Sequence, residues 1–112
     1  ITECVKFAEK ETKKFGLRAP MVGHLGDGNF HVILPYDPLK KETYKKIREF
    51  SDLLIKKTLE LNGTITGEHG VGLHKKDYLI KEHGDNIPVM KSIKRTIDPN
   101  NIMNPGKIFD LN

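Results

Sequence analysis

The chain has 112 residues, of which 37% are hydrophobic and 30% are charged, as expected for one ordinary folded domain. It has no apolar run of the roughly 18–20 residues that cross a bilayer, and Cys4 is its single cysteine, so a transmembrane segment and a disulfide scaffold are excluded. Nineteen Lys and Arg against 15 Asp and Glu give a net charge of +4. Because stretches such as 40–48 and 75–82 carry charges of both signs, the charge indicates solvated helix faces rather than a nucleic-acid surface.

The N-terminal third predicts a helix followed by a β-hairpin. Residues 2–15 mix charged and apolar positions at a helical spacing, and Gly16 is a natural end for that helix. Two short apolar runs, residues 20–25 and 29–34, lie on either side of Asp27-Gly28. An Asp-Gly pair between two such runs predicts an antiparallel hairpin with a two-residue type I′ turn.

The middle of the chain predicts one long helix and a further short strand. Asp37 suits the N-cap of that helix and Pro38 its first residue, because proline lacks the backbone N–H that this position does not need. Asn62-Gly63 predicts the end of the helix. The β-branched residues 64–66 then favour a short strand.

Two more helices are expected before a turn-rich tail. Residues 73–82 favour one helix, and Asp85 suits the N-cap of a second that ends before Pro99. The fold class is therefore α+β, with a small antiparallel sheet covered by three or four helices. Since so few strands make an incomplete sheet, we expect a ferredoxin-like piece of a larger domain, completed by strands from elsewhere in a parent protein or from a second copy.

Two histidines lie on either side of the predicted hairpin turn. With Asp27-Gly28 at its centre, the turn places His24 directly opposite His31, with their Cβ atoms about 4.5–5.5 Å apart. Two imidazoles so placed can share one metal ion at about 2.0–2.1 Å each. An ordinary pair of solvated histidines on a sheet face is the alternative, and the spacing alone leaves both interpretations open.

A second candidate cluster is the Glu68-His69 pair, which three glycines surround. Such glycines allow a tight turn or a close approach of the backbone to a ligand. The pair could be an exposed acid and base on a turn. Alternatively, Glu68 could be a third metal ligand beside a histidine that stays available for proton transfer. Two histidines and one carboxylate leave coordination positions open for substrate, as in catalytic metal sites.

Three motifs resemble the C-terminal domain of FAD-linked oxidases, the family of glycolate oxidase flavoprotein subunits, D-lactate dehydrogenases and D-2-hydroxyglutarate dehydrogenases. They are GHLGDGNFH at residues 23–31, GEHGVG at 67–72 and IDPNNIMNPGKI at 97–108. The resemblance implies that His24, His31 and Glu68 bind a divalent metal, zinc or manganese. It also implies that His69 is the general base in the oxidation of a 2-hydroxy acid to a 2-oxo acid, with hydride transfer to FAD.

The same resemblance gives weaker expectations for two asparagines and for the rest of the enzyme. Asn29 would orient the substrate or the flavin edge, and Asn104 would lie near the flavin domain. Residues 1–112 would form the C-terminal part of the substrate- and metal-binding domain, while FAD would be bound mainly by an N-terminal domain that this sequence does not match. Alone, the chain is therefore expected to be inactive, as a piece of a longer protein or a split subunit.

The expected partners are a small 2-hydroxy acid and an FAD-binding domain or subunit, with a homo-oligomer as an option. No nucleic acid is expected. The expected location is the cytoplasm, with peripheral membrane association through an electron acceptor as an option. Two other functions fit the same residues: a metal-dependent hydrolase using His24, His31 and Glu68 with a metal-bound water, and a non-catalytic subunit whose hairpin edge mediates assembly.

Overall fold

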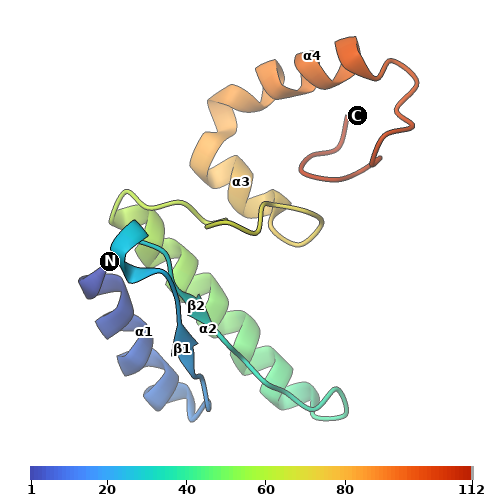
Figure 1. The fold of residues 1–112 in the computed structure, drawn as a ribbon. Coiled ribbons are helices and arrows are strands. Elements are labelled where there is room, and N and C mark those ends of the chain that lie inside the picture. The colour runs from blue at the N-terminus through green and yellow to red at the C-terminus, as the bar shows by residue number, and fades with distance from the viewer. Residues whose placement is uncertain (112) are drawn as a thin grey trace. The chain divides into compact units, whose positions relative to one another are not determined.

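The structure, a computed structural model, describes residues 1–111 and contains two compact units (Figure 1). The first unit is Ile1–Gly63, and the second unit begins at Thr64. In the described residues, four α-helices accompany one two-stranded antiparallel sheet, which confirms the α+β class. None of these helices combines the length and the apolar character needed to cross a membrane.

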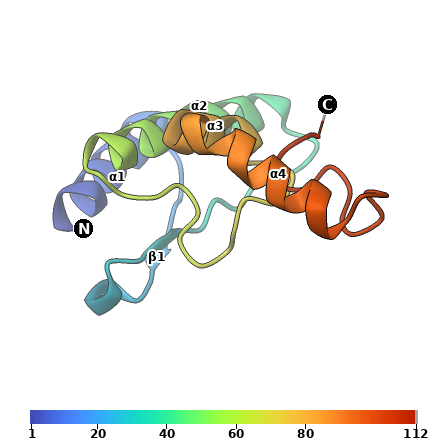
Figure 2. The ribbon, with the colours of Figure 1, turned by 90° about the horizontal axis from the view of Figure 1, so that it is seen from above.

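The first unit is built on two helices, α1 (Thr2–Phe15) and α2 (Lys41–Glu60), which pack against each other. Their core contains the fully buried ring of Phe50, which meets Phe15 edge-on at a centroid distance of 6.3 Å. The predicted bounds of α1 are confirmed, and Gly16 ends it in the left-handed conformation at φ 63°. The hairpin tip stands away from the α1–α2 pair (Figure 2).

Helix α2 ends as predicted but begins later. Asn62 adopts φ 57°, and the N–H of Gly63 donates to the carbonyl of Thr58 at 2.9 Å, so Asn62-Gly63 does end the helix. The predicted start at Asp37 and Pro38 is wrong, because these residues form a separate turn. Both the side chain and the carbonyl of Asp37 accept backbone N–H bonds within the next three residues. With those acceptors used locally, the helix starts only at Lys41.

The hairpin pairs β1 (Met21–Val22) with β2 (His31–Val32), and its register differs from the predicted one. Val22 is paired with His31, so the connection spans residues 23–30 and holds a 3₁₀-turn, η1 (Leu25–Asp27). The predicted type I′ turn, with His24 directly opposite His31, is therefore wrong. The carbonyl of His24 accepts the N–H groups of Asp27 at 2.9 Å and Asn29 at 3.2 Å. These local bonds take the place of the ladder bonds that a tighter hairpin would make.

The second unit contains α3 (Lys76–His83), the 3₁₀-turn η2 (Gly84–Asn86) and α4 (Ile87–Ile97). Helix α3 begins three residues after the predicted start at Leu73, and Asp85 lies in η2 instead of capping α4. The end of α4 before Pro99 is confirmed. Residues 64–66 form no strand, and within residues 1–111 the sheet has no third strand. The backbone of Ile65 is instead bound by two side chains, that of Lys75 directly before α3 and that of Glu82 within it.

Candidate metal centre

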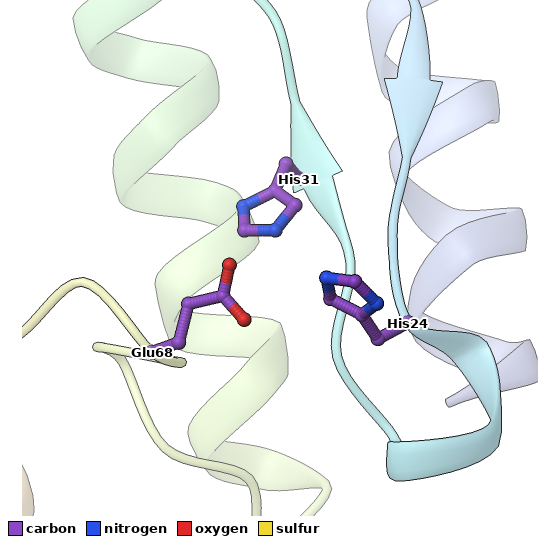
Figure 3. Close-up of side chains that lie close together, drawn as sticks. All are labelled: His24, His31 and Glu68. Carbon is purple, nitrogen blue, oxygen red and sulfur yellow. The ribbon is translucent and has the colours of Figure 1, made fainter.

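His24 and His31 come together at the hairpin. His31 lies in β2, where it is paired with Val22, and His24 lies in the connection two residues after Val22. The ring centroids are 6.4 Å apart and the ring planes are nearly perpendicular, at 86° (Figure 3). His24 is exposed and His31 is half-buried. The two histidines therefore meet although the register that predicted their meeting is wrong.

This histidine pair fits a divalent metal. One ring nitrogen of His24 and one of His31 lie within 4.8 Å of each other. Two nitrogens that share a tetrahedral zinc at 2.0–2.1 Å each are separated by roughly 3.3 Å. Neutral imidazole is also a common ligand for zinc and related ions.

Gly23 is what lets the two arms of the hairpin approach each other directly before His24. A β-carbon at this position would lie 2.5 Å from the Cα of Phe30 and 2.6 Å from the carbonyl oxygen of Asn29. Both neighbours are backbone atoms, so only glycine fits without a shift of the chain. No role for Gly23 was predicted from the sequence. Its place immediately before a candidate ligand was the signal that could have revealed it.

Glu68 and His69 lie on a tight turn of the second unit. The N–H of His69 donates to the carbonyl of Thr66 at 3.2 Å, and Gly67 and Gly70 take left-handed φ angles of 53° and 76°. The side chains of Glu68 and His69 are both exposed, and Glu68 Oε1 lies 3.7 Å from His69 Nε2. Figure 3 also draws the Glu68 carboxylate. The second unit therefore presents Glu68 and His69 as exposed neighbours on a glycine-containing turn.

The two asparagines occupy different settings. Asn29 is half-buried in the hairpin connection, two residues before His31, and its N–H donates to the carbonyl of His24. Asn104 is exposed in the tail of the second unit at φ 47°, where its carbonyl accepts the N–H of Lys107 at 3.3 Å. The structure thus places Asn29 beside the histidine pair and gives Asn104 a turn-forming role.

The third motif contains a buried structural residue, Asp98, that was not predicted from the sequence. Asp98 is 4% exposed, and its carboxylate accepts bonds from the Lys94 ammonium and from the N–H groups of Ile102 at 3.0 Å and Met103 at 2.9 Å. The bond from Lys94, helped by the two backbone bonds, lowers the pKa of Asp98 below its ordinary value. The turn after α4 is therefore organised around one buried carboxylate.

Comparison with known proteins agrees with these motifs. The family described as FAD linked oxidases, C-terminal domain, matches residues 1–108. The chain therefore belongs to this family, as the three motifs predicted.

Among curated relatives, the mitochondrial D-lactate dehydrogenase [cytochrome] of Arabidopsis thaliana is 40% identical over 97% of this chain and 19% of its own length. The glycolate oxidase subunit GlcD of Bacillus subtilis is 39% identical over 97% of this chain and 23% of its own length. The D-2-hydroxyglutarate dehydrogenase of Stutzerimonas stutzeri is 44% identical over 78% of this chain and 19% of its own length. The chain thus spans about a fifth of the length of these relatives.

Proposed function

We propose that this chain is the C-terminal catalytic part of an FAD-dependent 2-hydroxy acid dehydrogenase or oxidase of the glycolate or D-lactate type. The observation that carries the proposal is the His24–His31 pair on the hairpin of a chain that belongs to the FAD-linked oxidase family. The names of the relatives support a 2-hydroxy acid as the substrate class. In this proposal an FAD-binding domain or subunit, outside these 112 residues, holds the flavin.

Each candidate residue then has one role. His24, His31 and Glu68 bind a zinc or manganese ion and thereby fix the place of the substrate. When bound, the metal supplies Lewis acidity that favours loss of the hydroxyl proton, and the flavin accepts the hydride from C2. His69 takes the hydroxyl proton on its imidazole, since histidine exchanges protons near neutral pH. Loss of that proton and of the hydride leaves a 2-oxo acid.

Two further assignments complete the proposal. Asn29, beside His24, orients the substrate or the edge of the flavin, and Asn104 lies toward the flavin domain. The predicted cytoplasmic location and homo-oligomer stay predictions.

The test is metal binding and activity of the intact protein after His24→Ala. Loss of a residue that only orients a metal ligand typically weakens metal binding about 10- to 100-fold, so loss of a ligand itself should weaken zinc affinity by more than about 100-fold. Turnover of D-lactate and glycolate with an artificial electron acceptor should fall with it. His74→Ala, at an exposed histidine outside the proposed ligand set, is the matched control and should leave both unchanged.

Two outcomes would contradict the proposal. Zinc affinity that is equal in wild type and in the His24→Ala variant would remove the metal site. Ester hydrolysis by the zinc-loaded chain without flavin, lost in the same variant, would indicate a hydrolase instead.

A further inference from the structure

Both backbone polar groups of Ile65 are bound by charged side chains, one from Lys75 directly before α3 and one from Glu82 near the end of α3. The N–H of Ile65 donates to the Glu82 carboxylate at 3.1 Å, and its carbonyl accepts from the Lys75 ammonium at 3.0 Å. Ile65 itself is only 7% exposed. A buried residue whose N–H and C=O are each bound by a charged side chain has its backbone fixed in position and orientation.

The bound backbone of Ile65 fixes the start of the segment that holds the Glu68-His69 turn, and we call it the near anchor of that turn. Thr66 follows Ile65 directly, and its carbonyl closes the turn by accepting the N–H of His69 at 3.2 Å. The far anchor is Gly72, whose carbonyl accepts the N–H of Ile108 at 2.8 Å. The glycines between the two anchors restrict their own backbone very little. The position of the two functional side chains therefore depends on the anchors.

Lys75 occupies an unusual setting for a lysine. Its side chain is partly buried, and this burial lowers its pKa. Glu82 is also largely withdrawn from solvent, with 11% of its side chain exposed, and its second oxygen lies 3.1 Å from His83. Removing either charged group would leave a backbone polar atom of the buried Ile65 without its partner, which would lower the stability of the folded chain.

We propose that Lys75 and Glu82 are positioning residues, which hold the backbone of Ile65 so that the next turn presents Glu68 as a metal ligand and His69 as a base. This inference rests on the proposed function for the roles of Glu68 and His69. The structural part of it, that the two side chains restrain the turn, rests only on contacts within the second unit.

The experiment compares Lys75→Met with Lys81→Met in the intact protein. Both variants remove one positive charge associated with α3, but Lys81 lies over the ring of Tyr78, 5.4 Å from its centroid, and does not hold the turn. Lys75→Met should weaken zinc affinity, measured by competition with a chelating dye, about 10- to 100-fold, as is typical when the support of a ligand is lost. Lys81→Met should leave it unchanged, and Lys75→Arg should restore much of the loss.

A second readout does not depend on metal or activity. Amide hydrogen exchange across residues 66–70 of the metal-free protein should be faster in Lys75→Met and in Glu82→Ala than in wild type. Glu82→Gln, which keeps an acceptor for the Ile65 N–H, should stay close to wild type. If Lys75→Met lowers the thermal midpoint too far for comparison, the two Glu82 variants carry the same test.

The outcomes separate this inference from the proposed function. Zinc affinity that falls in His24→Ala but stays unchanged in Lys75→Met would overturn the positioning role and leave the metal site intact. Unchanged exchange in both Lys75→Met and Glu82→Ala would overturn it whether or not the protein binds zinc. A raised KM for the hydroxy acid, with unchanged zinc affinity and exchange, would instead make Lys75 a direct substrate contact.

Discussion

At the scale of single residues, the glycine-rich turn carries two neighbouring side chains with different proposed tasks. Glu68 would bind metal, which requires a carboxylate oxygen. His69 would move a proton, which requires a group that gains and loses one near neutral pH. Their side chains are both exposed and only 3.7 Å apart at the nearest polar atoms, so the two tasks can be separated only by replacing one side chain at a time.

Replacing the proposed base should lower turnover while leaving metal binding intact. General acid–base catalysis contributes roughly 100- to 10,000-fold, so His69→Gln should reduce kcat by a factor in that range. Zinc affinity of the same variant should match wild type. Glu68→Gln should instead weaken zinc affinity, and turnover should fall as a consequence of the lost metal. An unchanged kcat in His69→Gln, measured under saturating substrate, would show that another group takes the proton.

Asp98 should make the stability of the second unit depend on pH. The Lys94 bond lowers the pKa of Asp98 in the folded chain below its unfolded value, so this contribution to stability is fully present above the unfolded value. It is lost as pH falls through the lowered folded value. Asp98→Asn should therefore melt at a lower temperature than wild type at pH 7, and the difference should shrink below about pH 3.8. A difference that is constant from pH 7 to pH 2.5 would contradict this account.

At the scale of elements, sequence pattern predicted helix ends better than helix starts. Gly16 and Asn62-Gly63 were recognisable because left-handed residues stop helices for a local reason. Asp37 and Pro38 have equally strong helix-start chemistry, but Asp37 accepts the N–H groups of Leu39 and Lys40 in a separate turn before the helix. The same Asp-Pro pair suits either a helix start or a separate turn, so the pair alone cannot decide between the two structures.

The hairpin shows why the candidate site was only partly predictable. His24 and His31 were identifiable by residue type and spacing, yet the assumed turn gave the wrong register. The two rings nevertheless lie 6.4 Å apart between centroids, although His24 lies in the connection beyond β1. The roles of Lys75 and Glu82 could not be predicted from the sequence, since their bonds to the backbone of the buried Ile65 form only once α3 is packed.

The close approach at Gly23 gives a test of the hairpin itself. Gly23→Ala should force the backbone of the two arms apart and move His24, because a β-carbon there overlaps backbone atoms of Phe30 and Asn29. Ligand positions must be held within about 0.5 Å, so zinc affinity should fall by roughly tenfold or more. Gly26→Ala is the matched control in the same connection, since a β-carbon there meets nothing within 4 Å. Equal zinc affinity in the two variants would contradict the role given to Gly23.

At the scale of the whole molecule, the proposed ligands come from both compact units: the histidines from the first and Glu68 from the second. A metal ion bound by all three ligands should therefore stabilise both units. At a concentration 100 times its Kd, zinc should add about 2.7 kcal/mol to the free energy of unfolding. Amide exchange should slow around residues 24–31 and also around residues 66–70. Protection confined to the hairpin would show that Glu68 is not a ligand.

The tail after α4 also changes how shorter fragments of this chain should be designed. Chain ends are usually the safest places to trim, but that choice depends on what the backbone there is bonded to. Here Ile108 donates to Gly72, Lys76 binds the carbonyl of Gly106 and the carboxylate of Asp110, and Arg95 donates to the carbonyl of Leu111. A fragment cut before residue 106 would keep every proposed catalytic side chain and still lose the far anchor of their turn.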